Sequence, residues 1–473
     1  MNTASPLSLM RWPDASWPSA MCPVRLCAVL VCAGLLCLGL SGCAEQAALP
    51  VSAGTGLSPE LPPPRQTIVP TVNIAPARPW QPGEAPEPAT GLKITAFAQM
   101  LDHPRWLLVL PNGDVLVAES NAPPKPDDRQ GIRGWIMGKV MKRAGAATPS
   151  ANRLTLLRDT DGDGVADLRS VLVQGLNSPF GMALIGDRLY IAETDQVVAV
   201  PYRDGVTSII DQPVRLVELP AGTINHHWTK SLLASADGLH LYVGVGSNSN
   251  VGERGMAAET GRAAIWEVTI ATGAHRELAT GLRNPVGLAL EPRTGALWAT
   301  VNERDELGSD LVPDFLTSVV DGAFYGWPYS YFGMHVDARP SPARPDRVAA
   351  ARVPDYALGP HTASLGLASA AGNQLPARFA EGMFIGQHGS WNRRPHSGYK
   401  VIFVPFQQGR PTGEAPIDVL NGFLAEDGTA RGRPVGVAID RRGGLLVADD
   451  VGNTVWRVSG VEPVLLPRAA AVR

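Results

Sequence analysis

The sequence predicts an all-β protein, a six-bladed β-propeller that follows an N-terminal signal and a Pro-rich tether. A unit of polar residues, an apolar strand, a turn and a second apolar strand recurs along the chain. The 50 glycines and 42 prolines favour turn-rich β structure, and long segments with a helical period are few beyond the N-terminus. Each unit is a small sheet that cannot bury both faces alone, whereas six units packed around an axis can.

The first 43 residues are predicted to be a secretory signal. Arg25 precedes an apolar run over residues 26–40 that is too short for a comfortable membrane span. The Leu-Ser-Gly-Cys sequence that ends at Cys43 resembles a bacterial lipobox, which implies that Cys43 carries a lipid and anchors a periplasmic protein. Ala44 in the next position favours the outer membrane. The alternative is an ordinary signal cleaved near Ala44.

The rest of the chain divides into three parts. Residues 44–91 are rich in proline and alanine and lack a hydrophobic period, which predicts a semi-extended tether that holds the folded part off the membrane. Residues 92–462 contain the repeated units, and residues 463–473 form a short tail. All five cysteines lie within the first 43 residues, so disulfides do not stabilise the folded part. The net charge of −3 gives no indication of nucleic-acid binding.

Five units share the pattern clearly and a sixth is weaker. The five begin at Asp102, Gly175, His226, Gly281 and Arg431, and the weaker one begins at His361. The last unit shows three strands, and residues 93–97 supply a fourth that would join the two ends of the ring and remove its free edges. Two β-sandwich domains are the alternative architecture.

Polar residues that precede the inner strands are the candidate site. The innermost strands of a propeller begin near the axis, so the residues before them surround one pocket. The side chains expected there are His226, His227, Lys230, Arg283, Asn284, His361, Arg431 and Arg433, with Asn177 at the side. Each cation alone is more simply a surface charge, but several at equivalent repeat positions indicate a shared pocket. A histidine base beside guanidinium groups suits an anionic, planar ligand and the abstraction of a proton.

Several of these motifs together resemble the soluble quinoprotein glucose and L-sorbosone dehydrogenase family, over residues 93–460. The similarity rests on His227 ten residues before Asp237-Gly238, on the unit that begins at Gly281, on residues 302–305 and 325–328, and on Arg431-Gly-Arg433. The sorbosone-type branch is the most similar, judged by residues 226–229, 246–250 and 388–393.

The resemblance implies a six-bladed propeller that binds pyrroloquinoline quinone (PQQ) and calcium and oxidises an aldose or related sugar by hydride transfer. His227, or His226 if the count starts from Lys230, would be the general base, and Arg283 would polarise the quinone oxygen. The residues implied to contact the cofactor are Asn284, Arg431, Arg433, Asn177, His361, Asn392, Arg393 and Lys230. Backbone carbonyls of Arg304 and Asp305 would bind calcium, and a membrane quinone or a cytochrome would accept the electrons.

A second possible calcium site lies before the second unit. Asp159, Asp161, Asp163 and Asp167 offer oxygen ligands at alternate positions, with glycines for a tight turn. The glutamate that closes an EF-hand loop is absent, because Ser170 occupies its position. The alternative is an Asp-Gly-rich turn between blades, and any calcium here would be structural.

Three other functions compete with sugar oxidation. A calcium-dependent lactonase-type propeller would need acidic ligands on the axis, where this sequence places basic residues. A non-catalytic binding propeller would keep the shape without the cofactor. A serine hydrolase is suggested by residues 388–391, but no Gly-x-Ser-x-Gly turn surrounds Ser390.

Overall fold

The computed structural model describes residues 45–67, 71–124, 138–139 and 142–461. The expected signal with Cys43 and the C-terminal tail lie outside the described residues. Within the described ranges, no helix is both long and apolar enough to cross a membrane.

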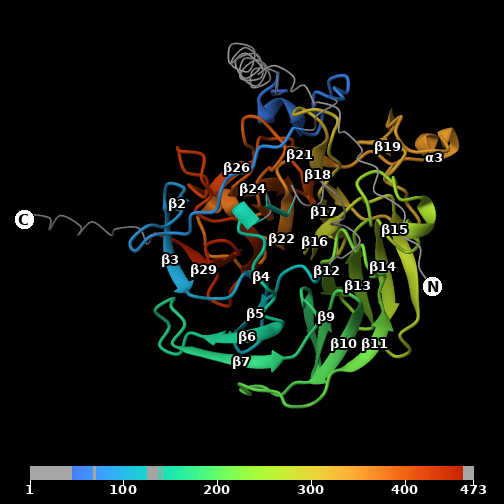
Figure 1. Cartoon of the computed structure of the whole chain (residues 1–473). Helices are drawn as coiled ribbons and strands as arrows, with labels where there is room; N and C mark the ends of the chain where they lie inside the picture. Colours follow the sequence, from blue (N-terminus) through green and yellow to red (C-terminus); the bar gives the residue numbers. More distant parts are fainter. Residues whose placement is uncertain (1–44, 68–70, 125–137, 140–141, 462–473) are drawn as a thin grey trace, which may run out of the picture. The chain divides into compact units, whose positions relative to one another are not determined.

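Six antiparallel sheets surround a central axis, and the chain runs outward through each sheet (Figure 1). Blade one contains β4 (Pro104–Val109), β5 (Val115–Glu119), β6 (Arg153–Arg158) and β7 (Leu168–Gln174). Blade two contains β8 (Met182–Ile185), β9 (Arg188–Ala192), β10 (Gln196–Pro201) and β11 (Val214–Glu218). Blade three contains β12 (Lys230–Ala234), β13 (His240–Val245), β14 (Ala264–Thr269) and β15 (His275–Thr280).

The remaining blades follow the same order. Blade four contains β16 (Pro285–Leu290), β17 (Leu297–Val301), β18 (Pro313–Ser318) and β21 (Tyr356–Pro360). Blade five contains β22 (Ser364–Ser369), β23 (Gly382–Gln387), β24 (Lys400–Gln407) and β26 (Ile417–Asn421), with β25 (Arg410–Pro411) beside β24. Blade six contains β27 (Pro434–Ile439), β28 (Leu445–Asp449), β29 (Thr454–Gly460) and β3 (Leu92–Ala98). Short elements are η1 (Val51–Gly54), η2 (Met256–Glu259), η3 (Ala377–Phe379), α3 (Pro345–Ala349) and the hairpin of β19 (Ser330–Tyr331) and β20 (His335–Val336).

The structure confirms the predicted propeller and its closure. The innermost strands β4, β8, β12, β16, β22 and β27 contact one another in this order around the axis. Strand β3 pairs with β29 from Leu92 opposite Gly460 to Ala98 opposite Val455, so the N-terminal strand completes the last blade. This pairing removes the free edges that an open ring would expose.

The apolar strands form the core because they are covered on both faces. Strands β5 and β28 are buried at every position, and side chains such as Val117 and Leu446 pack in one cluster between blades one and six. A near-continuous apolar run is the pattern of a strand with sheets on both sides. The first two strands of each blade are antiparallel. Each inner strand therefore begins at the end of the propeller where the second strand of its blade ends. The loops at this end are called the mouth loops below.

Gly181, just before β8, is required by the close approach of two blades. A Cβ at this position would lie 2.2 Å from the backbone nitrogen of Leu232 in β12. We expect Gly181→Ala to lower the free energy of unfolding by about 3 kcal/mol, because the backbone of Leu232 cannot move aside without disturbing blade three. Gly295→Ala is the control, since Gly295 has open space around it, and its positive φ of 71° should cost only about 1 kcal/mol. Equal losses in denaturant unfolding would contradict this account.

The described part of the expected tether does not run free of the propeller. It is extended, as the proline content predicts, but it lies against the blades. Strand β1 (Thr55–Gly56) adds to the outer edge of β21, and β2 (Glu87–Pro88) adds to β26. Trp80 packs edge-on against Phe423 and Trp456, with ring centroids 5.7 Å away in both cases. The outer edges of blades four and five and a partly buried tryptophan hold the segment, which composition alone does not indicate.

Candidate functional site

His227 and His226 lie in the mouth loop that leads into β12. The Nδ1 atom of His227 is 2.8 Å from the carbonyl oxygen of Ser247 and 3.1 Å from its Oγ. A carbonyl oxygen only accepts, so Nδ1 carries the proton and donates, and Nε2 keeps its lone pair. The ring of His226 stands edge-on to it, with centroids 4.7 Å apart. The geometry gives His227 the tautomer that a general base requires.

Arg283 is buried in the mouth loop before β16, with a side chain 2% exposed. Its guanidinium donates to the Asn250 carbonyl at 3.2 Å, to Asn250 Oδ1 at 3.0 Å and to the Glu303 carbonyl at 2.7 Å. Its Nη2 atom also lies 3.4 Å from Asp305 Oδ2. Arg283 therefore ties together the loops that follow β13 and β17, and its orientation is fixed.

One loop positions both His227 and Arg283. Residues 247–250 hold the histidine through Ser247 and the arginine through Asn250. The buried carboxylate of Glu259 supports this loop from behind, because it accepts hydrogen bonds from the Asn248 amide at 2.6 Å and from the Ser249 hydroxyl. Burial raises the pKa of Glu259, and these two bonds act in the opposite direction. The carboxylate thus acts on the site through the loop, without touching it.

Lys230 and Asn284 also reach the mouth, as the repeat pattern predicts. Lys230 is completely buried, and its Nζ lies 3.3 Å from the Trp228 carbonyl. Asn284 is 6% exposed, and its Oδ1 is a buried acceptor without a hydrogen-bond partner within the described residues. A buried acceptor of this kind costs free energy unless a ligand or water satisfies it.

Asp305 joins blades four and five at the mouth. Its Oδ1 accepts a hydrogen bond of 2.7 Å from Asn392 Nδ2 and lies 3.6 Å from His361 Nδ1. Burial opposes the charged form of Asp305, but the bond from His361 and the charge of Arg283 hold its pKa below the ordinary value. Burial likewise opposes a charged His361, yet Asp305 and the Gly308 carbonyl, 2.9 Å from Nε2, raise its pKa. His361 uses both ring nitrogens in the protein, so it braces the site and does not offer a nitrogen to a cofactor.

The predicted calcium loop is held by hydrogen bonds of its own, and the calcium there stays a prediction. The Arg304 side chain is fully buried and donates to the carbonyls of Pro328 and Ser330 at 2.7 and 2.6 Å. The Asp305 carbonyl accepts from Asn250 and from the Arg339 guanidinium at 2.8 Å. Calcium needs several oxygen ligands, and one of the two predicted here, the Asp305 carbonyl, already accepts these two hydrogen bonds.

A second polar cluster, centred on Asp450, lies at the mouths of blades one, five and six. One carboxylate oxygen, Oδ2, is 2.6 Å from Arg105 Nη1, 2.9 Å from His388 Nε2 and 3.5 Å from His103 Nε2. Burial alone would raise the pKa of Asp450, but the charges of His388, His103 and Arg105 lower it strongly. Arg105 also lies over the Trp228 ring, 5.7 Å from its centroid, which connects this cluster to the histidine loop.

His103 makes the fold sensitive to acid. It is 4% exposed, and burial lowers its pKa to about 4. As pH falls from about 6.5 to 4 the unfolded chain takes up a proton that the folded chain does not, so up to about 3 kcal/mol of stability is lost. We expect His103→Gln to lose less stability than the unaltered protein between pH 7 and pH 4 in denaturant titrations. The same exchange at exposed His335 should leave the difference unchanged, and an equally steep loss in His103→Gln would refute the assignment.

The side chains of three predicted site residues make their contacts away from the other candidate residues. Arg431 lies over the Trp80 ring, 6.0 Å from its centroid, and faces Glu84 at 4.0 Å. Arg393 is buried and donates to the carbonyls of Ser309 and Leu49 at 3.0 Å each. Asn177 is exposed and bonds to Asp195 at 3.0 Å. Of the two alternatives at residues 392 and 393, Asn392 faces the site.

Arg433, in contrast, stays close to the second cluster. It is 4% exposed and lies over the Tyr399 ring, 5.0 Å from its centroid. Its Nη2 donates to the Ala75 carbonyl at 3.2 Å, and its Nε is buried without a hydrogen-bond partner in the part of the chain that the structure describes. Burial is the largest cause of the lowered pKa of His388, and the charge of Arg433 lowers this pKa further. The negative charge of Asp450 acts in the opposite direction.

A set of buried acids that shape the mouth loops was not predicted from the sequence. Glu119 and Asp449 end the second strand of their blades and Glu193 directly follows one, and each accepts the backbone N–H of a mouth residue of its blade. The distances are 2.6 Å from Asn177 N to Glu193 and 2.7 Å from Arg433 N to Asp449. The signal was present as an acidic residue after Ala118, Ala192 and Ala448.

The Asp-rich loop before the second unit brings three of its four carboxylates together. Oxygen atoms of Asp159, Asp161 and Asp167 lie within 4.8 Å of one another. Asp163 instead accepts the Val165 amide at 2.7 Å. The Arg442 guanidinium approaches Asp159 to 3.2 Å and supplies a positive charge at this loop. The predicted calcium there stays a prediction.

Comparison with known proteins gives relatives that are similar in sequence. The chain is 26% identical over 305 residues to an uncharacterized protein of Borreliella burgdorferi, a match that spans 61% of this chain and 77% of that protein. It is 32% identical over 134 residues to a pyrroloquinoline quinone-dependent pyranose dehydrogenase of Coprinopsis cinerea, which is 24% of this chain and 17% of the relative.

Solved structures have the same fold. The holo PQQ domain of the Coprinopsis cinerea pyranose dehydrogenase has a TM-score of 0.63 at 21% identity, over 82% of this chain and 100% of that domain. The Trichoderma reesei protein of carbohydrate-active enzyme family AA12 has a TM-score of 0.63 at 19% identity, over 82% and 99% of the two chains. A family model described as TrAA12-like matches residues 149–314 and 333–460, well over half of the sequence. The chain therefore belongs to the TrAA12-like family.

Proposed function

We propose that this protein is a PQQ-dependent oxidoreductase that oxidises an aldose or a related sugar, such as a glucose- or sorbosone-like compound. The observation that carries the proposal is the fixed tautomer of His227, in one loop network with the buried Arg283. Relatives named as PQQ-dependent sugar dehydrogenases support the reaction class.

The mouth offers suitable partners for a planar, anionic quinone. Arg433 Nε is a buried donor without a hydrogen-bond partner among the described residues, and Asn284 Oδ1 and Asn392 Oδ1 are buried acceptors without one, which an N–H or O–H group of the ligand would satisfy. Asn284, Asn392, Arg433, Lys230 and Arg283 would hold the cofactor, whose carboxylates and quinone oxygens match guanidinium, ammonium and amide donors. When bound, PQQ supplies a two-electron acceptor for a hydride.

The protein's own residues handle the proton. Oxidation of a cyclic sugar at C1 removes a hydride from carbon and a proton from the hydroxyl, and leaves a lactone. Nε2 of His227 takes the proton, because Ser247 holds Nδ1 in its donating state. The imidazolium that forms keeps its bond to the Ser247 carbonyl, which stabilises the added charge. Arg283 would stabilise negative charge on the bound cofactor through its own charge, because its N–H groups already bond to Asn250, Glu303 and Asp305 and hold it in one orientation.

The proposed location is the bacterial cell envelope, with the chain anchored through Cys43 and facing the periplasm. A membrane quinone or a cytochrome would then take the electrons. The support is the Leu-Ser-Gly-Cys sequence at Cys43. Fractionation of cells with the Cys43→Ser variant tests it, since loss of the lipid should move the protein from the membrane fraction to the soluble fraction.

The activity is tested by steady-state assay of the full chain with PQQ, a panel of aldoses and an artificial electron acceptor. Sugar-dependent reduction of the acceptor with formation of lactone supports the proposal, and protein without PQQ is the control. PQQ binding with no oxidation of any sugar would favour a non-catalytic binding propeller. Hydrolysis of lactones without PQQ would favour the lactonase alternative.

A further inference from the structure

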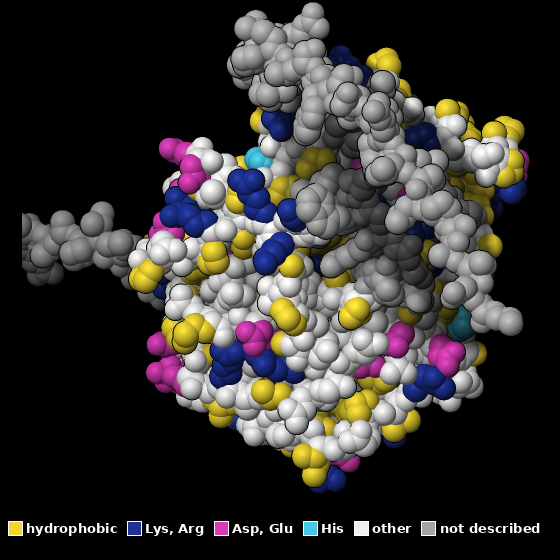
Figure 2. Space-filling view, viewed as in Figure 1, with side chains coloured by type: hydrophobic (Ala, Val, Ile, Leu, Met, Phe, Trp, Pro, Cys, Tyr) yellow, Lys and Arg dark blue, Asp and Glu magenta, His cyan; other side chains and the backbone are white. Residues whose placement is uncertain are grey.

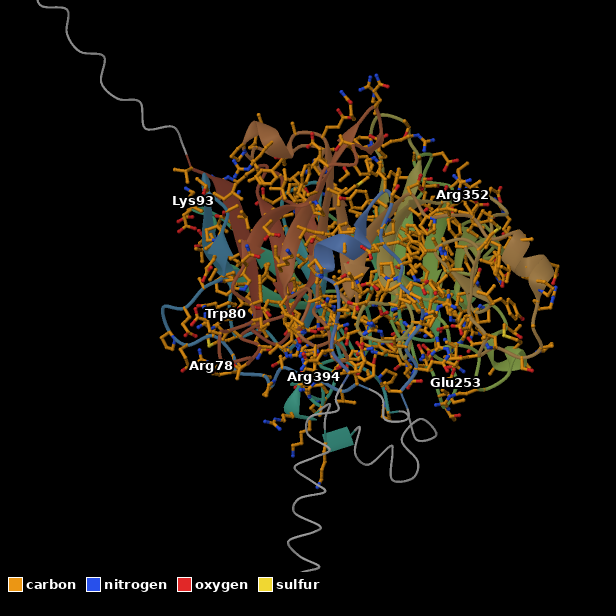
Figure 3. All side chains as sticks on the ribbon, turned by 90° about the horizontal axis from the view of Figure 1, so that it is seen from above. Arg78, Trp80, Lys93, Glu253, Arg352 and Arg394 are labelled. Carbon is orange, nitrogen blue, oxygen red and sulfur yellow. The ribbon has the colours of Figure 1, made fainter. Side chains whose placement is uncertain are left out.

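Residues 46–67 and 71–82, called the roof below, cross the mouth end of the propeller. The roof begins where the amides of Ala47 and Ala48 bond to the Arg394 carbonyl and to Asp310, at 2.8 and 2.7 Å. It ends near Trp80, whose Nε1 donates to Asp449 Oδ2 at 2.7 Å. Figure 3 shows Arg78, Trp80, Arg394 and Glu253 along one edge of the molecule, whereas Lys93 and Arg352 lie away from it.

The roof makes hydrogen bonds to the loops that carry Asp305 and the proposed cofactor-binding residue Asn392. The Arg65 amide donates to the Leu307 carbonyl at 2.9 Å, two residues from Asp305. The Asn73 amide donates to the Trp391 carbonyl at 2.7 Å, next to Asn392. The hydrogen bonds from the roof thus go to blades four, five and six and, through the Ala77 amide and the Arg143 carbonyl at 2.9 Å, to the loop between β5 and β6 of blade one.

Ala75 is the point where the roof enters the site most deeply. It is completely buried, and its carbonyl accepts the hydrogen bond from Arg433. On either side, the Asn73 amide group donates to the Arg393 carbonyl at 2.8 Å, and the Pro76 carbonyl accepts the Ala430 amide at 2.8 Å. The backbone of the roof therefore touches a guanidinium that the proposed function assigns to the cofactor.

A cavity of about 130 Å³ lies between the roof and the mouth loops. The roof contributes Arg65, Gln66, Thr67 and Thr71, and the loops contribute Glu306, Gly308, Arg339, Trp391 and Asn392. Asn392 connects this cavity to the site, because its Nδ2 binds Asp305 and its Oδ1 is buried without a partner among the described residues. On the same face, Lys and Arg side chains gather over the region of β24 and β26, which favours an anion (Figure 2).

We infer that the roof is a wall of the cofactor site that retains PQQ. This inference rests on the proposed function. Because the roof bonds to the loops of Asp305 and Asn392 and to Arg433, cofactor exchange requires the roof to lift. The roof should therefore slow both the binding and the release of PQQ.

The test compares PQQ release from the full-length protein and from variants with weakened roof anchors. Trp80→Ala removes the bond to Asp449 and the packing on two aromatic rings, and Asn73→Ala removes the bond to the Arg393 carbonyl. Release is followed after rapid dilution by the absorbance difference between bound and free PQQ. We expect release to be at least tenfold faster in Trp80→Ala and several-fold faster in Asn73→Ala. Val72→Ala is the control, because the Val72 side chain is 40% exposed.

Hydrogen exchange gives a readout that does not depend on activity. Without PQQ, amides of residues 303–308 and 388–394 should exchange faster in Trp80→Ala than in the unaltered protein. Faster exchange with unchanged release rates in both anchor variants would overturn the inference and leave the proposed function intact. An unaltered protein that binds no PQQ would overturn the proposed function, and the inference with it.

Discussion

Replacing His227 with alanine is expected to reduce sugar-dependent reduction of PQQ by about 10²- to 10⁴-fold, the range typical of removing a general base. The reason is the bond from Nδ1 to the Ser247 carbonyl, which leaves Nε2 as the proton acceptor. PQQ binding should persist, because the proposed cofactor contacts come from other side chains. The measurement is the rate of PQQ absorbance change after mixing the loaded protein with sugar.

His226→Ala is the matched control, since its ring lies beside that of His227 and should tolerate removal with a much smaller loss. A larger loss in His226→Ala than in His227→Ala would move the base to His226. The comparison therefore decides between the two histidines that the sequence leaves open.

Replacing Arg283 with alanine is expected to lower the free energy of unfolding by about 3–5 kcal/mol. The buried guanidinium donates hydrogen bonds to Asn250 and to the Glu303 carbonyl and pairs with Asp305. Its removal leaves the largely buried Asp305 carboxylate without its arginine. PQQ affinity should fall as well, because two loops at the mouth lose their common anchor. Denaturant unfolding and a PQQ titration measure the two effects.

Arg276→Ala is the control for Arg283→Ala. Arg276 is 47% exposed and pairs with Glu267 and Asp321 at the surface, so its loss should cost less than about 1 kcal/mol. A double-mutant cycle with Asp305→Asn should show coupling, because the two residues are 3.4 Å apart. Additive effects, or a loss in Arg283→Ala as small as that in Arg276→Ala, would contradict the network described here.

The repeat pattern predicted the fold because strands and turns are determined largely by neighbouring residues in the sequence. Each apolar strand with its turn is a local signal, and the last unit's missing strand pointed to residues 93–97, which pair with β29 as expected. The same alignment of repeats placed His227, Lys230, Arg283 and Asn284 at one end of the axis. These positions are fixed by strand register, which a sequence pattern captures.

The remaining features depend on contacts between distant segments. In the sequence, Arg431 and Arg433 are both arginines just before the inner strand of the last blade. In the structure, Trp80 holds Arg431 away from the mouth. The proline-rich segment lacks a period, so its docking through Ala75 and Trp80 leaves no pattern to read. Asp450 draws together three side chains from blades one and five, and only the closed ring makes them neighbours.

The most direct test of the central claim is a single turnover without an external electron acceptor. The full chain is loaded with PQQ, freed of excess cofactor and mixed anaerobically with an aldose. The account predicts that one sugar is oxidised to its lactone for each PQQ reduced, and that the His227→Ala variant stays oxidised on the same timescale. A loaded protein whose PQQ is not reduced by any aldose would contradict the account.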